Sequence, residues 1–136
     1  MATYNKFNQT VEDMANGVYN CATDQFTVAL TVAAPVATNT VLANLTEIAY
    51  TNLSGRNLTT ASSGQTSGTF TQLFSDLVLT ASGGAVAAFR YITIYDNTPT
   101  SPADPLLCFY DFGSSLVLAD GETLTIDFTT STFTLA

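Results

Sequence analysis

The densest apolar pattern lies in residues 89–112, where two short runs rich in aromatic and β-branched side chains flank a linker of Pro, Asp, Asn and Thr. Two such runs around a polar linker are typical of a β-hairpin. Side chains alternate between the two faces of a strand, and here both faces carry apolar bulk, whereas a sheet with one wet face has a polar side. The pattern therefore predicts a hairpin covered on both sides. One cover is the core of the domain, and the other is a helix, a loop or a neighbouring subunit.

A pattern with helical spacing lies near the N-terminus. Its apolar residues follow the i, i+4, i+7, i+11 spacing of a stripe along one side of a helix, namely Phe7, Val11, Met14 and Val18. This spacing predicts one amphipathic helix over residues 3–19, with Asp13 on its solvated side. Asn16-Gly17 favours a stop. Residues 1–20 form either a helix that completes the fold or an arm that docks on a partner.

Other strand-like runs precede and follow the hairpin. Residues 26–32 and 123–129 alternate apolar and polar positions, which predicts strands with one buried face. Residues 70–81 have a less regular strand pattern that leaves a short helical turn open, and residues 133–135 predict a last edge strand. Asp120-Gly121 suits the positive φ angles of a tight hairpin turn. The sum is a mainly β fold, an antiparallel β-sandwich or barrel of about seven to eight strands with one N-terminal amphipathic helix.

The least core-like segment covers residues 53–69, LSGRNLTTASSGQTSGT, which is rich in Ser, Thr and Gly. We expect a long polar loop here, either mobile or held by a partner, because the segment exceeds an ordinary hairpin loop in length. At 136 residues, the chain has the size of one domain over residues 1–136.

Charge and composition narrow the classes of partner. Three basic residues face eleven acidic ones, for a net charge of −8. Binding to a nucleic-acid backbone relies on Lys and Arg that neutralise phosphates, so we expect no nucleic-acid partner. The opening MATYNKFNQT lacks the basic start and apolar run of a signal peptide, and no apolar run is long enough to cross a membrane. We therefore expect no membrane association.

The sequence offers little reactive chemistry. It contains no histidine, which removes the usual general base and the commonest metal ligand. We expect no enzymatic activity and assign no catalytic, cofactor-binding or metal-binding residue. The acidic residues in predicted loops are interpreted as turn formers in preference to calcium ligands, and these are Asp96, Asp104, Asp120 and Glu122. Cys21 and Cys108 are expected to be buried thiols, not a disulfide.

The aromatic faces of the predicted hairpin are a better candidate for a binding surface. Each exposed aromatic ring covers ~150 to 250 Å². Burying about three of them against another chain would contribute roughly 11 to 19 kcal/mol before the costs of association. The alternative is that the helix predicted over residues 3–19 covers this face. The candidate interface residues are Phe7, Val11, Met14, Tyr91, Tyr95 and Tyr110.

Several stretches carry a resemblance when they are taken together: MATYNKFNQTVEDMANGVYN, FTVALTVAAPVATNTVLANLTEIA, FRYITIYDNTP and DPLLCFYDFGSSLVLADGETLTIDF. They resemble a family of small virion structural proteins of tailed bacteriophages. The match covers nearly the whole chain, and its motifs are strands and turns. The resemblance implies a place in the virion, in the head or in the tail fibre.

Charge narrows the place that the resemblance implies. A chain of charge −8 is repelled from the DNA-facing side of a capsid shell, so the outer surface fits better. We therefore expect an outer capsid decoration (cement) protein that is made in the cytoplasm of the bacterial host. Its partners would be the major capsid protein and copies of itself, in a homo-oligomer such as a trimer. Either the N-terminal segment or residues 53–69 would make these contacts, and removing residues 1–10 should weaken capsid binding without unfolding the domain.

Two other functions remain open at this point. A tail or tail-fibre component would use the same apolar hairpin to form rings or trimers. A carbohydrate- or receptor-binding module would present Tyr91, Tyr95 or Tyr110 on a sugar-binding surface.

Overall fold

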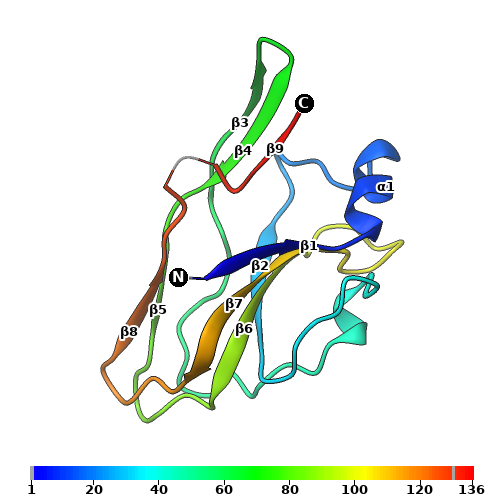
Figure 1. The fold of residues 1–136 in the computed structure, drawn as a ribbon. Coiled ribbons are helices and arrows are strands. Elements are labelled where there is room, and N and C mark those ends of the chain that lie inside the picture. The colour runs from blue at the N-terminus through cyan, green and yellow to red at the C-terminus, as the bar shows by residue number, and fades with distance from the viewer. Residues whose placement is uncertain (1, 130) are drawn as a thin grey trace.

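The computed structural model describes residues 2–129 and 131–136 (Figure 1). This part of the chain contains one α-helix, α1 (Gln9–Ala15), and one 3-10 helix, η1 (Leu42–Asn44). Its nine strands are β1 (Thr3–Lys6), β2 (Phe26–Thr31), β3 (Thr60–Thr66), β4 (Thr69–Phe74), β5 (Leu77–Thr80), β6 (Phe89–Asp96), β7 (Leu106–Leu116), β8 (Thr123–Ile126) and β9 (Phe133–Leu135). The prediction of a mainly β fold with one N-terminal helix is confirmed.

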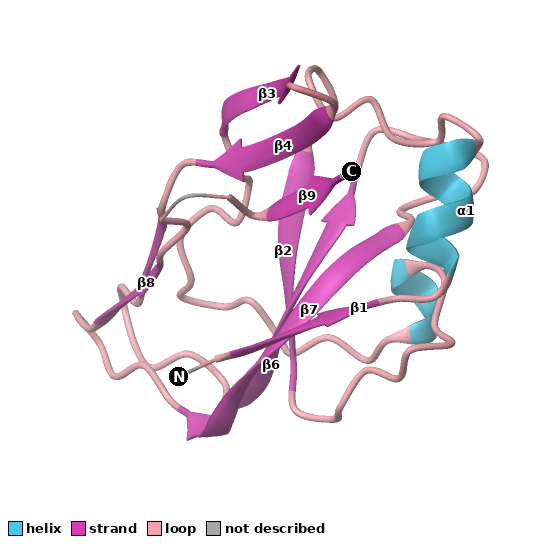
Figure 2. Ribbon diagram, turned by 45° about the horizontal axis from the view of Figure 1, so that its top comes forward, coloured by secondary structure: helices cyan, strands magenta, loops and turns pink. Residues whose placement is uncertain are grey.

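The strands form three antiparallel sheets. The largest has the order β1-β7-β6-β2, the second has the order β3-β4-β9, and the third pairs β5 with β8. Figure 2 shows β3 and β4 at one end of the molecule and α1 along one side. The sheets in the described residues stay open and pack on one another, so the sandwich-like alternative of the prediction is found and the closed barrel is not.

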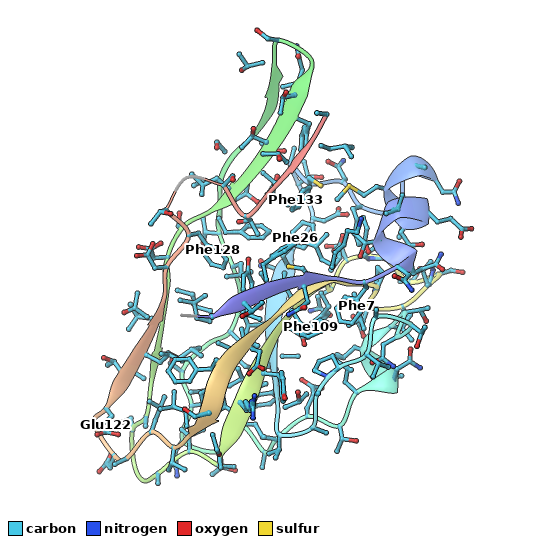
Figure 3. The ribbon with its side chains drawn as sticks, in the orientation of Figure 1. Phe7, Phe26, Phe109, Glu122, Phe128 and Phe133 are labelled. Atoms are coloured by element: carbon cyan, nitrogen blue, oxygen red, sulfur yellow. The ribbon has the colours of Figure 1, made fainter. Side chains whose placement is uncertain are left out.

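The larger hydrophobic core joins the three sheets. Phe26 of β2 packs against Phe74 of β4 with ring centroids 5.2 Å apart, and Phe74 packs against Phe128 at 5.7 Å. Figure 3 labels Phe26 and Phe128. Leu79 of β5 and Ile94 of β6 are buried in the same core. Full burial of a side chain of this size contributes about 1.5 to 3 kcal/mol. This core therefore holds the small sheets against the large one.

A smaller core lies on the opposite face of the four-stranded sheet. It contains Phe7, Tyr95 and Phe109, and the rings of Phe7 and Phe109 lie 5.1 Å apart (Figure 3). Leu42 and Leu45, in the long connection between β2 and β3, pack over it. The prediction that the β6–β7 hairpin is covered on both faces is confirmed, and the second cover is a loop.

Two register shifts separate the hairpin's side chains between these cores. The β6–β7 pairing shifts between Phe89 and Tyr91 and again between Ile94 and Tyr95. Phe89 consequently faces the larger core while Tyr91 packs against the smaller one. A β-bulge inserts one residue and breaks the strict alternation of a strand, so a period of two assigns these side chains only locally.

The N-terminal helix is shorter than predicted. Residues 3–6 form β1, which pairs with β7 in a register that places Lys6 opposite Cys108. The helix begins after Asn8 and ends before Gly17, whose φ of +69° terminates it, as predicted from Asn16-Gly17. The expectation that the helix begins at residue 3 is wrong, because the first residues complete a sheet edge. At its other end the helix stops at the predicted Asn16-Gly17 and does not continue to residue 19.

The side of α1 that is buried is also different from the predicted one. Val11 is 56% exposed, whereas Thr10 and Asp13 are each 4% exposed. The Thr10 hydroxyl donates to the Leu107 carbonyl of β7 at 2.7 Å. The Asp13 carboxylate accepts from the Gln9 side-chain amide at 3.1 Å. Polar side chains can face the sheet because these hydrogen bonds satisfy them.

The predicted polar loop over residues 53–69 is mostly a hairpin. Its second half forms β3, which pairs with β4 through a two-residue turn at Ser67 and Gly68, both with positive φ. Its Ser and Thr residues adopt strand geometry. The segment lacks the apolar alternation that predicts a buried strand, which is why the sequence indicated a loop. Residues 70–81 form two strands, β4 and β5, interrupted at Ser75 and Asp76, and the helical turn left open there does not form.

The remaining strand predictions are confirmed with two changes. All six residues of β2 are buried, so this strand has no wet face. Asp120-Gly121 forms a tight turn, with Gly121 at φ +85°. This turn precedes β8, but β8 pairs with β5 and not with β7. The hairpin expected around the turn is therefore absent from the described pairings. The strands predicted at residues 123–129 and 133–135 correspond to β8 and β9.

Candidate functional site

An apolar groove opens where α1, β1 and β9 meet. Its volume is about 320 Å³, and its walls include Tyr4 and Lys6 of β1, Val11 and Met14 of α1, and Phe133 and Leu135 of β9. Tyr4, Val11 and Leu135 are 43%, 56% and 55% exposed. Three of the largest exposed apolar side chains of the molecule therefore surround one groove, an arrangement typical of a contact surface.

Two sheet edges without a partner strand among residues 2–129 and 131–136 frame this groove. β1 is an outer strand of the four-stranded sheet, and β9 is an outer strand of the three-stranded sheet. The other outer strand of the large sheet, β2, is covered by the chain itself, since Val28 donates its amide to the Arg56 carbonyl and Leu58 donates to the Phe26 carbonyl. An uncovered edge can accept a further strand, so the groove combines apolar surface with backbone that can still form hydrogen bonds.

Only Val11 and Met14, of the six residues predicted at an interface, line this groove. Phe7 is fully buried and Tyr95 is 5% exposed, both in the smaller core. These two residues are corrected from interface to core, because the loop carrying Leu42 and Leu45 and the β1–α1 junction cover them.

The three predicted tyrosines do not form one surface. Tyr91 packs toward the smaller core beside the Arg90 guanidinium, whose carbon lies 5.3 Å from the ring centroid. Tyr110 packs toward the larger core and meets Tyr4 edge to face at 5.6 Å. Arg90 binds Asp111 at 2.8 Å and holds the pKa of that carboxyl below its usual value. A sugar-binding platform built from Tyr91, Tyr95 and Tyr110 is therefore not present.

Sequence reasoning missed the groove residues Tyr4, Phe133 and Leu135. The runs that contain them are only four and three residues long, and so short a run shows no clear period. The alternation of Phe133 and Leu135 was sufficient for a strand, but the position of β9 beside β1 depends on the packing of two separate sheets.

Lys6 gives the groove its charge. The other basic side chains are paired, Arg56 with Glu47 at 3.6 Å and Arg90 with Asp111 at 2.8 Å. Lys6 forms no ion pair within residues 2–129 and 131–136. Burial raises the pKa of the neighbouring Tyr4, so its hydroxyl is neutral at physiological pH. The groove therefore suits an apolar partner surface that carries a carboxylate.

Asp24 and Asp96 form a second cluster of interest at the end of β6. Asp96 is fully buried, and its Oδ1 accepts the Thr98 amide at 3.0 Å, while its Oδ2 has no hydrogen-bond partner among the described residues. Burial, the largest cause, and the nearby Asp24 carboxyl together raise the pKa of Asp96 to about 7. The backbone N–H of Asn20 donates to the Asp24 carboxylate at 2.7 Å. A proton on Asp96 removes the like-charge repulsion in this pair.

Both cysteines are free thiols, as predicted, and Cys108 is buried, but Cys21 is only half-buried, against the expectation. Burial raises the pKa of Cys21 to about 11 and that of Cys108 to about 12. Because the thiolate is the reactive form, both are unreactive at neutral pH.

The part of the chain that is described places no three His, Cys, Asp or Glu side chains where they could share a metal ion. In the same residues, the one α-helix has only seven residues, so it does not meet the length needed to cross a bilayer.

Comparisons of this chain with protein-family models, curated proteins and solved structures found no match. A proposal for its function therefore depends on the sequence and on the geometry of the groove.

Proposed function

We propose that this chain is a structural protein of a tailed-bacteriophage virion that decorates the outer surface of the capsid. In this role it binds the major capsid protein and neighbouring copies of itself, and it stabilises the shell by bridging subunits. It is made in the cytoplasm of the bacterial host, acts without catalysis, and contacts neither nucleic acid nor membrane.

The observation that carries this proposal is the apolar groove between α1, β1 and β9. Exposed Tyr4, Val11 and Leu135 border it, and the two strand edges beside it have no partner strand in the described part of the chain. Burying such side chains and pairing such an edge both favour a stable protein contact. The resemblance of the sequence to small virion proteins supplies the setting for that contact.

The charge distribution supports the outer surface over the inner one. The net charge of −8 opposes contact with packaged DNA. Lys6, at the groove, is available for a carboxylate of the capsid surface. A groove with one cation on an acidic chain favours an acidic, apolar partner site.

The decisive measurement is the copy number of this chain per purified virion, by quantitative mass spectrometry against the major capsid protein. We expect a fixed ratio to the capsid subunit across the whole shell. A handful of copies per particle would indicate a tail or tail-fibre component instead, and absence from the particle would refute the proposal.

The groove itself can be tested with Val11→Asp. Purified protein would be titrated onto particles that lack it. We expect at least about tenfold weaker binding, because the variant places a carboxylate next to the proposed carboxylate of the partner, in a contact from which water is excluded. Val78→Asp is the matched control, since Val78 is similarly exposed at 49% and lies on β5, outside the groove. Equal binding by both variants would remove the groove from the proposal.

A further inference from the structure

The β3–β4 hairpin projects from the rest of the molecule, and β3 forms the outer strand of its sheet (Figure 1). Thr66 pairs with Thr69 across the two-residue turn, so these two residues exchange hydrogen bonds. Because the pattern alternates, Gly64 also bonds to its partner Thr71, whereas the backbone groups of Ser63 and Gln65 point away from β4. Within the described residues, no hydrogen bond joins those outward groups to another segment.

This edge lacks the usual protection against pairing. Natural edge strands carry charged side chains, proline or strong bulges that prevent contact with another strand. Residues 57–75 contain no charged residue and no proline. The one irregularity in the β3–β4 ladder lies at its far end, between Thr60 and Ser62. From Ser62 to Thr66 the strand is regular and mostly exposed.

We propose that β3 pairs with β3 of a second copy of this chain, antiparallel, about a two-fold axis at Gly64. In that register Ser63 of one copy faces Gln65 of the other, and their outward backbone groups form four hydrogen bonds. Gly64 meets its own symmetry mate in a non-hydrogen-bonded pair. The two three-stranded sheets become one continuous six-stranded sheet.

A second copy fits this edge for two reasons. An antiparallel pairing about a two-fold axis is self-complementary, since both copies present the same strand. Two chains of charge −8 also repel each other over most of their surface, and the charge-free hairpin lets them approach where that repulsion is weakest. A contact confined to one strand edge is smaller than the ~1,200 to 2,000 Å² of a stable interface. The dimer is therefore weak in solution and is populated where copies are concentrated.

The geometry can be tested by cross-linking. The Cα atoms of a non-hydrogen-bonded antiparallel pair lie about 4.5 Å apart, within the range of a disulfide. A Cβ at Gly64 meets nothing within 4 Å, so Gly64→Cys fits the monomer. We expect this variant to form a disulfide-linked dimer under mild oxidation, above the background that Cys21 and Cys108 give in the unmodified chain.

Thr71→Cys is the matched control for the cross-link. Thr71 pairs with Gly64 on the same face of the hairpin but sits one strand further from the axis. In the proposed dimer, its two copies are separated by three strand spacings, about 14 Å, which is too far for a disulfide. Equal cross-linking of both variants, or none by Gly64→Cys, would overturn the two-fold pairing.

Sedimentation of the full chain up to millimolar concentration provides an independent test. We expect a monomer–dimer equilibrium that Gly64→Lys weakens at least about tenfold, since like charges then meet at the axis. Thr71→Lys makes the same change in net charge away from the axis and should leave the equilibrium within about twofold. If the chain stays monomeric, or if both lysine variants act alike, the proposal fails. The remaining interpretation would be that the β3 edge pairs only with a different protein.

This inference deepens the proposed assembly role and rests on it only for its biological setting. The cross-link and the sedimentation use the purified chain, whereas the proposed function is tested by copy number in virions. A monomeric protein found at a fixed ratio to the capsid subunit would refute the pairing and keep the function. A protein that dimerises but is absent from virions would keep the pairing and refute the proposed function.

Discussion

Asp96 is the residue whose protonation most affects the folded state. In the unfolded chain its pKa lies near the usual ~3.9, and burial raises it to about 7 in the folded one. Between these values the folded state keeps a proton that the unfolded state releases. The contribution of protonated Asp96 to the free energy of unfolding is therefore complete below about pH 4. It decreases as the pH rises toward 7 and is lost above that value.

Asp96→Asn should remove this pH dependence. An amide at this position can donate to Asp24 at any pH, while its oxygen keeps the bond from the Thr98 amide. We expect the free energy of unfolding at pH 8 to rise by on the order of 2 kcal/mol, with little change at pH 4. Urea unfolding at both pH values measures this. Asp127→Asn, which makes the same charge change at an exposed residue, should show no such difference, and a matching gain there would contradict the assignment.

Single residues also show where sequence reasoning reaches its limit. Val11 and Phe7 belong to the same helical stripe, yet Val11 is exposed and Phe7 is fully buried. The difference arises because Phe7 precedes the helix and is held beside Phe109 by the β1–β7 pairing. The helical spacing assumed that both residues lie on one helix. Because Phe7 lies before the helix, the two side chains face different surroundings.

The β3–β4 hairpin shows how a turn determines an element. Ser67 and Gly68 both have positive φ, at 51° and 83°, a conformation that allows the two-residue turn and sets the strand register. Glycine adopts it without the steric cost that a Cβ adds. The hairpin therefore depends on backbone conformation at its tip more than on apolar burial.

Gly68→Ala and Gly64→Ala separate these effects. We expect Gly68→Ala to lower the stability of the hairpin by about 1 kcal/mol, because alanine is strained at positive φ. Gly64 lies in regular strand with free space around a Cβ, so Gly64→Ala should be neutral or slightly stabilising. Hydrogen exchange of the β3 and β4 amides at micromolar protein concentration reports both. Equal protection in the two variants would contradict this account of the turn.

At the level of elements, the sequence predicted strands best where apolar residues are dense. The β6–β7 hairpin, β2 and β8 follow from aromatic and β-branched runs. β3 could not be found in this way, since its Ser, Thr and Gly side chains bury little and its pairing depends on the turn that follows. The partners of β8 and β9 were equally out of reach, because a local pattern does not show which distant strand it will meet.

For the molecule as a whole, the four-stranded sheet carries a hydrophobic core on each face. Removing residues 1–10 would delete β1 and with it Phe7, the central ring of the smaller core. Such a truncation therefore affects the fold as well as any contact, which revises the expectation that the domain would stay intact without these residues.

We expect the chain without residues 1–10 to lose at least about 3 kcal/mol of unfolding free energy, the usual cost of removing one buried Phe. A typical domain has only ~5 to 15 kcal/mol, so much of the margin would be lost. Thermal unfolding measures the change. Val11→Ala, at an exposed site, should stay within ~0.5 kcal/mol, and an unaltered transition in the truncated chain would show that the smaller core contributes little.

The pairing of β1 with β7 also has a consequence for synthesis in the cell. Lys6 pairs with Cys108 and Gln72 with Phe133, so neither sheet edge forms until a distant segment has left the ribosome. At ~5 to 20 residues per second, β1 waits on the order of 5 to 20 s for its partner strand. Nascent chains would expose β1 and the outer edge of β4 without their partner strands during that interval. Translation speed and access to chaperones, more than the stability of the finished fold, should then set the yield of soluble protein.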